Sequence, residues 1–161
     1  MQESTRTPIS ITQALQEEAA EIQRFTELLK LEQVALSNGN TEELLVFATQ
    51  KDHCASRINQ LATQRNALLT AQGFIADRPG IEAWCAKNPK ETLAASVWTS
   101  ILSLAREAQE LNRLNGELIQ MRLQYNNKAL EALRGQENSL SLYGPDGQST
   151  GQGQQRINHT V

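Results

Sequence analysis

The stretch that decides the fold is ITQALQEEAAEIQRFTELLKLEQVALSNGN, which occupies residues 11–40. Its apolar residues recur every seven positions, at Leu15, Ile22, Leu29 and Leu36, and are flanked by Ala14, Phe25 and Leu28. This stripe is typical of an amphipathic helix that packs one face against a neighbour. We expect Ser10 to cap the first turn of the helix and Gly39 to end it in the left-handed conformation.

A second helix is expected directly after the first. Asn40 and Glu43 have the spacing of a capping box. Beyond them the apolar positions again repeat every seven residues, at Phe47, Cys54, Leu61 and Leu68, with Leu44 and Ile58 beside them. Because only a few residues link the two segments, we predict adjacent and antiparallel helices.

A third, longer helix follows a connection. Residues 73–90 are predicted to be irregular, with one helical turn around residues 81–86 and with Trp84 closing one end of the packed helices. The seven-residue spacing then returns over residues 91–134, at Val97, Leu104, Leu111, Leu118 and Tyr125. At 1.5 Å per residue this helix would span roughly 65 Å. It is longer than its partners, so we expect one end to extend beyond them.

The pattern as a whole predicts an all-α fold, namely an elongated antiparallel three-helix bundle or coiled coil with a long third helix and a flexible C-terminal tail. The helical domain covers residues 10–134, with helices at about 10–37, 40–72 and 91–134. Residues 135–161 hold five of the nine glycines. Their few apolar side chains cannot offset the entropy of ordering the backbone, so we expect a flexible tail available for partner binding.

Composition narrows the class of protein. The chain has 161 residues, the size of one ordinary domain, with a net charge of −3 and 4% aromatic residues. It contains no apolar run long enough to cross a membrane, and its first ten residues contain no secretory signal. We therefore expect a cytoplasmic protein without stable membrane insertion. Its acidic balance gives no general reason to bind nucleic acid.

The chain carries no enzyme signature. A glycine-rich phosphate loop, HExxH, GxSxG and a calcium-binding loop are all absent from the sequence. We expect no catalytic residue, metal or cofactor. The two cysteines and two histidines do not make a convincing zinc site, and Cys54 and Cys85 are expected to be ordinary, partly buried thiols. His53 and Cys54 are neighbours that point about 100° apart on a helix, so they do not face a common point.

Polar residues on the expected helices have structural interpretations. Glu17, Glu18 and Glu21 are predicted to lie on a solvated face of the first helix. Asn115 falls on the apolar stripe of the third helix, where a buried polar residue can set the helix register. Gly116 follows it in mid-helix, which suggests either close approach of another backbone or a flexible point.

Three segments carry a family resemblance. Residues 111–119 resemble an LNxxNGxLI segment, and residues 142–148, LYGPDGQ, resemble an LYGxDGQ motif near the C-terminus. The first hairpin is similar to the same family through the residues Ala35, Leu36, Gly39, Asn40, Leu44, Lys51, Leu61 and Arg65. The family is that of the FlgN proteins, chaperones of flagellar type III export, and the resemblance covers roughly residues 10–161.

The resemblance implies a cytoplasmic chaperone, without enzyme activity, for the hook-associated proteins FlgK and FlgL. It would bind their C-terminal helical segments, prevent premature assembly and deliver them to the export gate protein FlhA. The resemblance also implies that Tyr143 contributes to docking at that gate.

The residues themselves suggest a compatible client-binding surface near the end of the third helix. It would consist of Leu118, Met121, Tyr125, Ala129, Leu130 and Leu133, which offer an apolar stripe to a client helix. The alternative is a structural coiled-coil adaptor, which would use its seven-residue repeats to self-associate. Client preference and oligomeric state stay open at this point.

Overall fold

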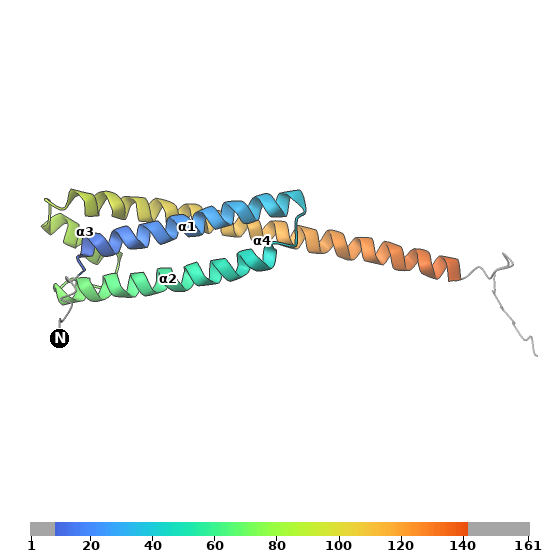
Figure 1. Cartoon of the computed structure of the whole chain (residues 1–161), viewed down its shortest axis with the longest axis horizontal. Coiled ribbons are helices and arrows are strands. Elements are labelled where there is room, and N and C mark those ends of the chain that lie inside the picture. The colour runs from blue at the N-terminus through green and yellow to red at the C-terminus, as the bar shows by residue number, and fades with distance from the viewer. Residues whose placement is uncertain (1–8, 142–161) are drawn as a thin grey trace, which may run out of the picture. The chain divides into compact units, whose positions relative to one another are not determined.

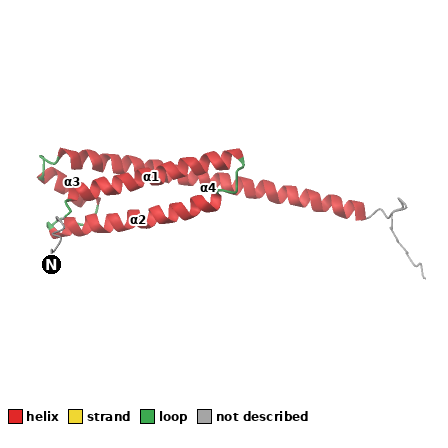
Figure 2. Ribbon diagram, viewed as in Figure 1, coloured by secondary structure: helices red, strands yellow, loops and turns green. Residues whose placement is uncertain are grey.

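The computed structural model describes residues 9–141, with side chains to residue 135. Within these limits every regular element is a helix (Figures 1 and 2). The helices are α1 (Ile11–Asn38), α2 (Leu44–Ala71), α3 (Arg78–Lys87) and α4 (Thr92–Ser141). The all-α prediction is therefore confirmed, with four helices in place of three. The chain divides into two compact units, Met1–Ile119 and Gln120–Val161, and α4 contributes to both.

The ends of α1 follow the predicted capping. The Ser10 hydroxyl accepts a hydrogen bond from the Gln13 backbone N–H at 3.1 Å. Gly39 has a φ of 77°, and its N–H donates to the carbonyls of the last turn. The predicted capping box at the start of α2 was wrong. α2 begins after Glu43, whose side chain makes no capping bond, and the Asn40 N–H donates to the Ala35 carbonyl instead.

α3 lies in the segment that we predicted to be irregular with a single turn. The Asp77 carboxylate caps it by accepting from the Gly80 N–H at 2.7 Å. Pro79 falls in the first turn, where a missing N–H leaves no helical bond unmade. Trp84 packs in the core next to Ile81, as predicted for a residue that closes one end of the packed helices.

α4 continues through Gly135 to Ser141. The predicted end of the third helix near Arg134 was therefore too early. One glycine inside a helix costs only about 1 kcal/mol relative to alanine, which the surrounding helix-forming residues offset. Residues 142–161, including most of the predicted tail, lie outside the described residues.

In the first unit, α1, α2, α3 and the N-terminal part of α4 share one core. Ion pairs between α1 and α2 join Glu18 to Arg65 and Glu32 to Lys51, so the two helices run antiparallel, as predicted. Figure 1 shows them side by side. The core cluster consists of Ile11, Leu15, Ile22, Leu69, Ile81, Trp84, Ala94, Trp98 and Ile101.

Candidate partner-binding surfaces

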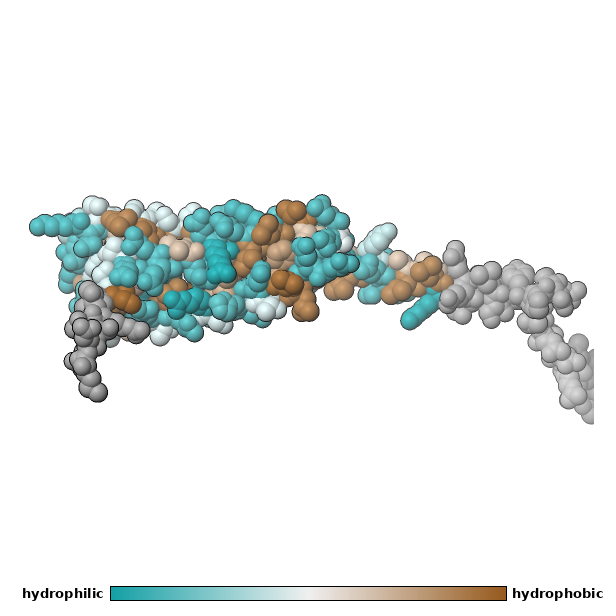
Figure 3. All heavy atoms as spheres, in the orientation of Figure 1, coloured by the Kyte–Doolittle hydropathy of each residue, from teal (hydrophilic) through white to brown (hydrophobic). Residues whose placement is uncertain are grey.

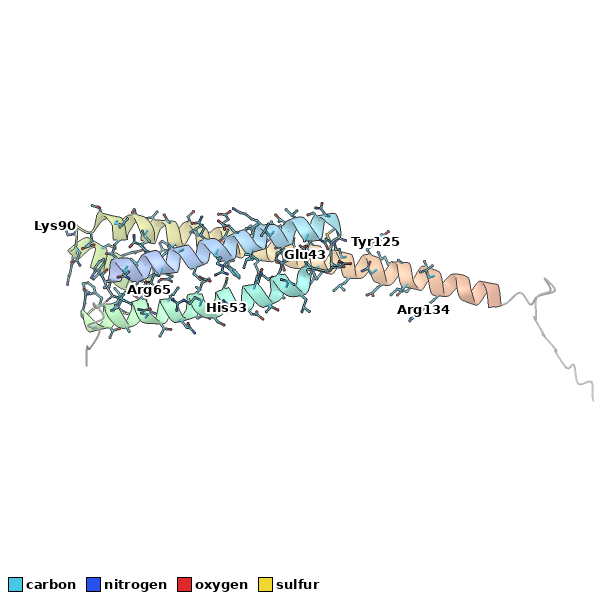
Figure 4. The ribbon with its side chains drawn as sticks, viewed as in Figure 1. Glu43, His53, Arg65, Lys90, Tyr125 and Arg134 are labelled. Atoms are coloured by element: carbon cyan, nitrogen blue, oxygen red, sulfur yellow. The ribbon has the colours of Figure 1, made fainter. Side chains whose placement is uncertain are left out.

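The second unit presents apolar side chains that the described part of the chain does not cover. Met121 is 65% exposed, Tyr125 74% and Leu130 53%. We call the full set the C-terminal apolar face of α4. It consists of Met121, Leu123, Tyr125, Ala129, Leu130, Ala132 and Leu133, all of which are exposed. Apolar spheres follow this part of α4 in Figure 3, and Tyr125 and Arg134 are labelled on it in Figure 4.

This face includes five of the six residues predicted to bind a client. The sixth, Leu118, is half-buried and belongs to the first unit. Leu123 and Ala132 were missed, although Leu123 lies one heptad before Leu130 and is also exposed. The predicted gate-docking residue, Tyr143, lies outside the described residues.

Basic residues border the C-terminal apolar face. Between Gln120 and Gly135 the basic side chains are Arg122, Lys128 and Arg134, and the one acidic side chain is Glu131. At about 100° per residue, Lys128 lies beside Met121 and Arg134 beside Leu123, while Glu131 falls on the opposite side of the helix. The face therefore combines apolar contact area with positive edges.

A second apolar surface lies in the first unit. It is a groove of about 290 Å³ lined by Ile22, Phe25, Ile58, Ala105, Ala108, Gln109 and Asn112. The small side chains Ala105 and Ala108 of α4 leave space in this groove beside Phe25 of α1 and Ile58 of α2. Nothing in the sequence analysis singled out this groove, because it depends on which residues of three helices meet.

One buried polar cluster joins α1, α2 and α4 in the first unit. Asn115, which is 1% exposed, donates to the Leu29 carbonyl at 2.9 Å and to the Glu32 carboxylate at 2.8 Å. The Lys51 ammonium donates to the same carboxylate at 2.7 Å and 2.9 Å. Asn115 is therefore buried, as predicted. The open space beside Gly116 excludes a close backbone approach there.

A second buried acid corrects the prediction of a solvated face on α1. Glu18 is 4% exposed and pairs with Arg65 at 3.0 Å. The Arg65 guanidinium also lies 5.4 Å from the centre of the Trp98 ring. Burial raises the pKa of the Glu18 carboxyl above its ordinary value of 4.5, while the Arg65 charge partly opposes that rise. The spacing Leu15, Glu18, Ile22 places this acid on the core side of the helix.

The thiols have the surroundings of structural cysteines. Cys54 is buried, Cys85 is partly buried, and both are free. Burial raises the pKa of the Cys54 thiol, and the Glu21 carboxylate adds to that rise. His53 lies on the exposed side of α2 (Figure 4), away from the buried Cys54. Among the described residues no cluster of three or more His, Cys, Asp or Glu side chains could hold a metal.

The helices of the described region include none with both the length and the apolar character needed to span a bilayer. The architecture therefore defines an all-helical protein, in which a helical hairpin packs against one part of a long helix and another part of that helix exposes an apolar face. A family model described as FlgN protein matches residues 7–151. The chain belongs to the FlgN family, whose members act in flagellar synthesis.

Individual relatives agree with this assignment. The chain is 28% identical over 135 residues to the flagella synthesis protein FlgN of Proteus mirabilis, and the match covers 76% of this chain and 90% of that protein. It is 24% identical over 95 residues to the flagella synthesis protein FlgN of Salmonella typhimurium, and the match covers 59% of this chain and 66% of that protein. No solved structure matches the chain.

Proposed function

We propose that the protein is a cytoplasmic, non-catalytic chaperone of flagellar type III export. It binds the C-terminal helical segments of the hook-associated proteins FlgK and FlgL, prevents their premature assembly and delivers them to the export gate. The observation that carries this proposal is the exposed C-terminal apolar face of α4, on a chain that belongs to the FlgN family.

The physical reason is the match between two amphipathic surfaces. A client helix with an uncovered apolar stripe would associate prematurely, and an exposed apolar helix face provides a temporary partner for it. Met121 adds a flexible side chain that adapts to more than one client. In this proposal the first unit acts as an antiparallel three-helix bundle that stabilises the start of α4.

Delivery to the gate is assigned to the C-terminal tail. Tyr143 stands in the LYGPDGQ stretch, where glycines flank an amphipathic aromatic side chain. Such a side chain is suited to insertion into a pocket of a partner, here FlhA. Replacement Tyr143→Ala should impair client secretion while leaving both the fold and client capture intact. Complete loss of client capture in this variant would contradict the docking role.

The client-binding role is tested with the double variant Met121→Gln and Leu130→Gln. Glutamine keeps the helix propensity of these positions and removes their apolar character. We expect at least about a tenfold loss of affinity for the C-terminal segments of FlgK and FlgL, measured by calorimetry, because two apolar contacts are lost. The helical circular dichroism should not change.

The matched control is Gln124→Ala, which lies on the opposite side of the same helix. Its affinity for both client segments should equal that of the unchanged chain. Undiminished affinity in the double variant would overturn the proposed binding surface.

A structural adaptor that self-associates is the second candidate, because the same exposed face could pack against another copy of this chain. Sedimentation of the free protein separates the two functions. A stable oligomer that does not change when client segments are added favours the adaptor, whereas a free chain that forms a client complex favours the chaperone.

A further inference from the structure

We propose that the C-terminal apolar face of α4 binds two client helices side by side, and that these helices carry carboxylates along their outer edges. This inference rests on the proposed chaperone function and specifies the form of the partner. It follows from the width of the face, from the packing of α4 in the first unit, and from the positions of the basic residues.

The face is too wide for one neighbouring helix. At about 100° per residue its apolar side chains cover an arc of about 200°, whereas a single packed neighbour is served by about 100°. The arc has two flanks with Arg122 between them, and the polar residue Asn126 lies within the second flank. The first flank consists of Met121, Tyr125, Ala129 and Ala132, and the second flank consists of Leu123, Leu130 and Leu133.

The first flank repeats the positions by which α4 packs on α1. Glu107 pairs with Lys30 of α1 at 2.7 Å, and Met121 lies two heptads after Glu107. Asn115 donates to the Leu29 carbonyl of α1 at 2.9 Å, and Ala129 lies two heptads after Asn115. These positions of α4 therefore serve to hold one helix.

Leu133 of the second flank repeats the positions by which α4 packs on α2. Arg65 of α2 lies over the Trp98 ring at 5.4 Å. Asn112 lines the groove together with Ile58 of α2. Leu133 follows Trp98 by five heptads and Asn112 by three. α4 thus holds two helices in the first unit, and in the second unit Met121 and Ala129 of the first set and Leu133 of the second set are apolar and exposed.

Charge defines the chemistry of the two bound helices. Lys128 borders the first flank and Arg134 borders the second. Charges beside an apolar seam select partners with the opposite charge at the facing positions. The client helices are therefore expected to have an apolar stripe edged by Asp or Glu.

The test is photo-crosslinking with the full chain and whole FlgK. A photoreactive amino acid replaces Met121 in the first flank or Leu130 in the second, and Gln124 on the opposite side serves as the matched control. We expect adducts from Met121 and Leu130 to map to two different helical segments of the client, and no adduct from Gln124.

Adducts from both flanks at the same client segment would overturn the inference. So would an adduct between two copies of this chain at one flank with the client at the other, because one of the helices would then not belong to the client. In either case the client is still captured, so the proposed function stands. If the unchanged chain fails to bind the client, the proposed function itself fails.

The expected acidic edges of the client helices are tested with charge variants of α4. Lys128→Glu with Arg134→Glu should weaken client binding about tenfold at low ionic strength and less at high ionic strength, because exposed charges are screened by salt. Glu131→Lys, on the far side of the helix, is the matched control and should leave the affinity within about twofold. Equal effects of the two changes would overturn the assignment of acidic client edges.

Discussion

Asn115 of α4 and Glu32 of α1 are joined by a buried hydrogen bond of 2.8 Å. Lys51 of α2 donates to the same carboxylate, so three helices meet at one acid. The Asn115 amide also donates to the Leu29 carbonyl. This side chain therefore helps to fix the position of α4 along α1 in the first unit.

Asn115→Ala is expected to lower the free energy of unfolding by about 1–3 kcal/mol, because two buried acceptors lose a donor. Urea denaturation followed by circular dichroism measures the change. Asn112→Ala is the matched control, since Asn112 is exposed and its replacement should cost less than about 0.5 kcal/mol. Equal costs at the two positions would contradict a special role for Asn115.

Glu18→Gln is expected to change the pH dependence of stability. Burial raises the pKa of the Glu18 carboxyl in the folded protein, so the folded state binds the proton more tightly than the unfolded chain does. The tighter proton binding stabilises the folded state when the pH is at or below the ordinary carboxyl pKa of 4.5. This stabilisation is lost as the pH rises through the raised pKa of the folded protein. The variant should lack this decline when unfolding is measured across that range. An identical pH profile in both proteins would count against it.

Replacement by alanine should have opposite effects on the stability of the fold at two helical glycines. A Cβ on Gly80 would lie 1.8 Å from the Ile75 carbonyl oxygen, so Gly80→Ala must displace the backbone and lower the melting temperature. A Cβ on Gly116 meets nothing within 4 Å, so Gly116→Ala should stabilise the fold by up to about 1 kcal/mol through helix propensity. Thermal unfolding of both variants checks the pair, and a destabilised Gly116→Ala would show that the glycine is needed for another reason.

The two thiols should differ in reactivity. Cys54 is 1% exposed, and burial raises the pKa of its thiol. Cys85 is more accessible, although burial raises the pKa of its thiol as well. In the folded protein a thiol reagent should therefore label Cys85 first and reach Cys54 only on unfolding. The variant Cys85→Ser should show almost no labelling before denaturation, and rapid labelling of that variant would contradict the burial of Cys54.

The long helices were predictable because their apolar residues repeat with helical spacing. Leu15, Leu29 and Leu36 are all buried on α1, and the caps at Ser10 and Gly39 are ordinary local chemistry. Only one turn of α3, around residues 81–86, was predicted, because proline and glycine normally interrupt helices. Here proline stands in the first turn, and the glycine accommodates a carbonyl that a side chain would displace.

The buried acids could not be assigned from one helix alone. Acidic residues such as Glu18 and Glu32 normally lie on a solvated helix face. Their burial is favourable here because Arg65 and Lys51 approach them from α2. On α4, most of the C-terminal apolar face was predictable from its spacing. The contributions of Leu123 and Ala132 were not recognised.

The two ion pairs between α1 and α2 are separated by two heptads in both helices, and Phe25 and Ile58 occupy the layer midway between them. If the hairpin slipped by one heptad in either direction, one acid would face Ile58 and the other would lose its cation. Misaligned hairpins would therefore place charges in an apolar layer and would be rejected early. The two ion pairs thus favour a single alignment of α1 and α2.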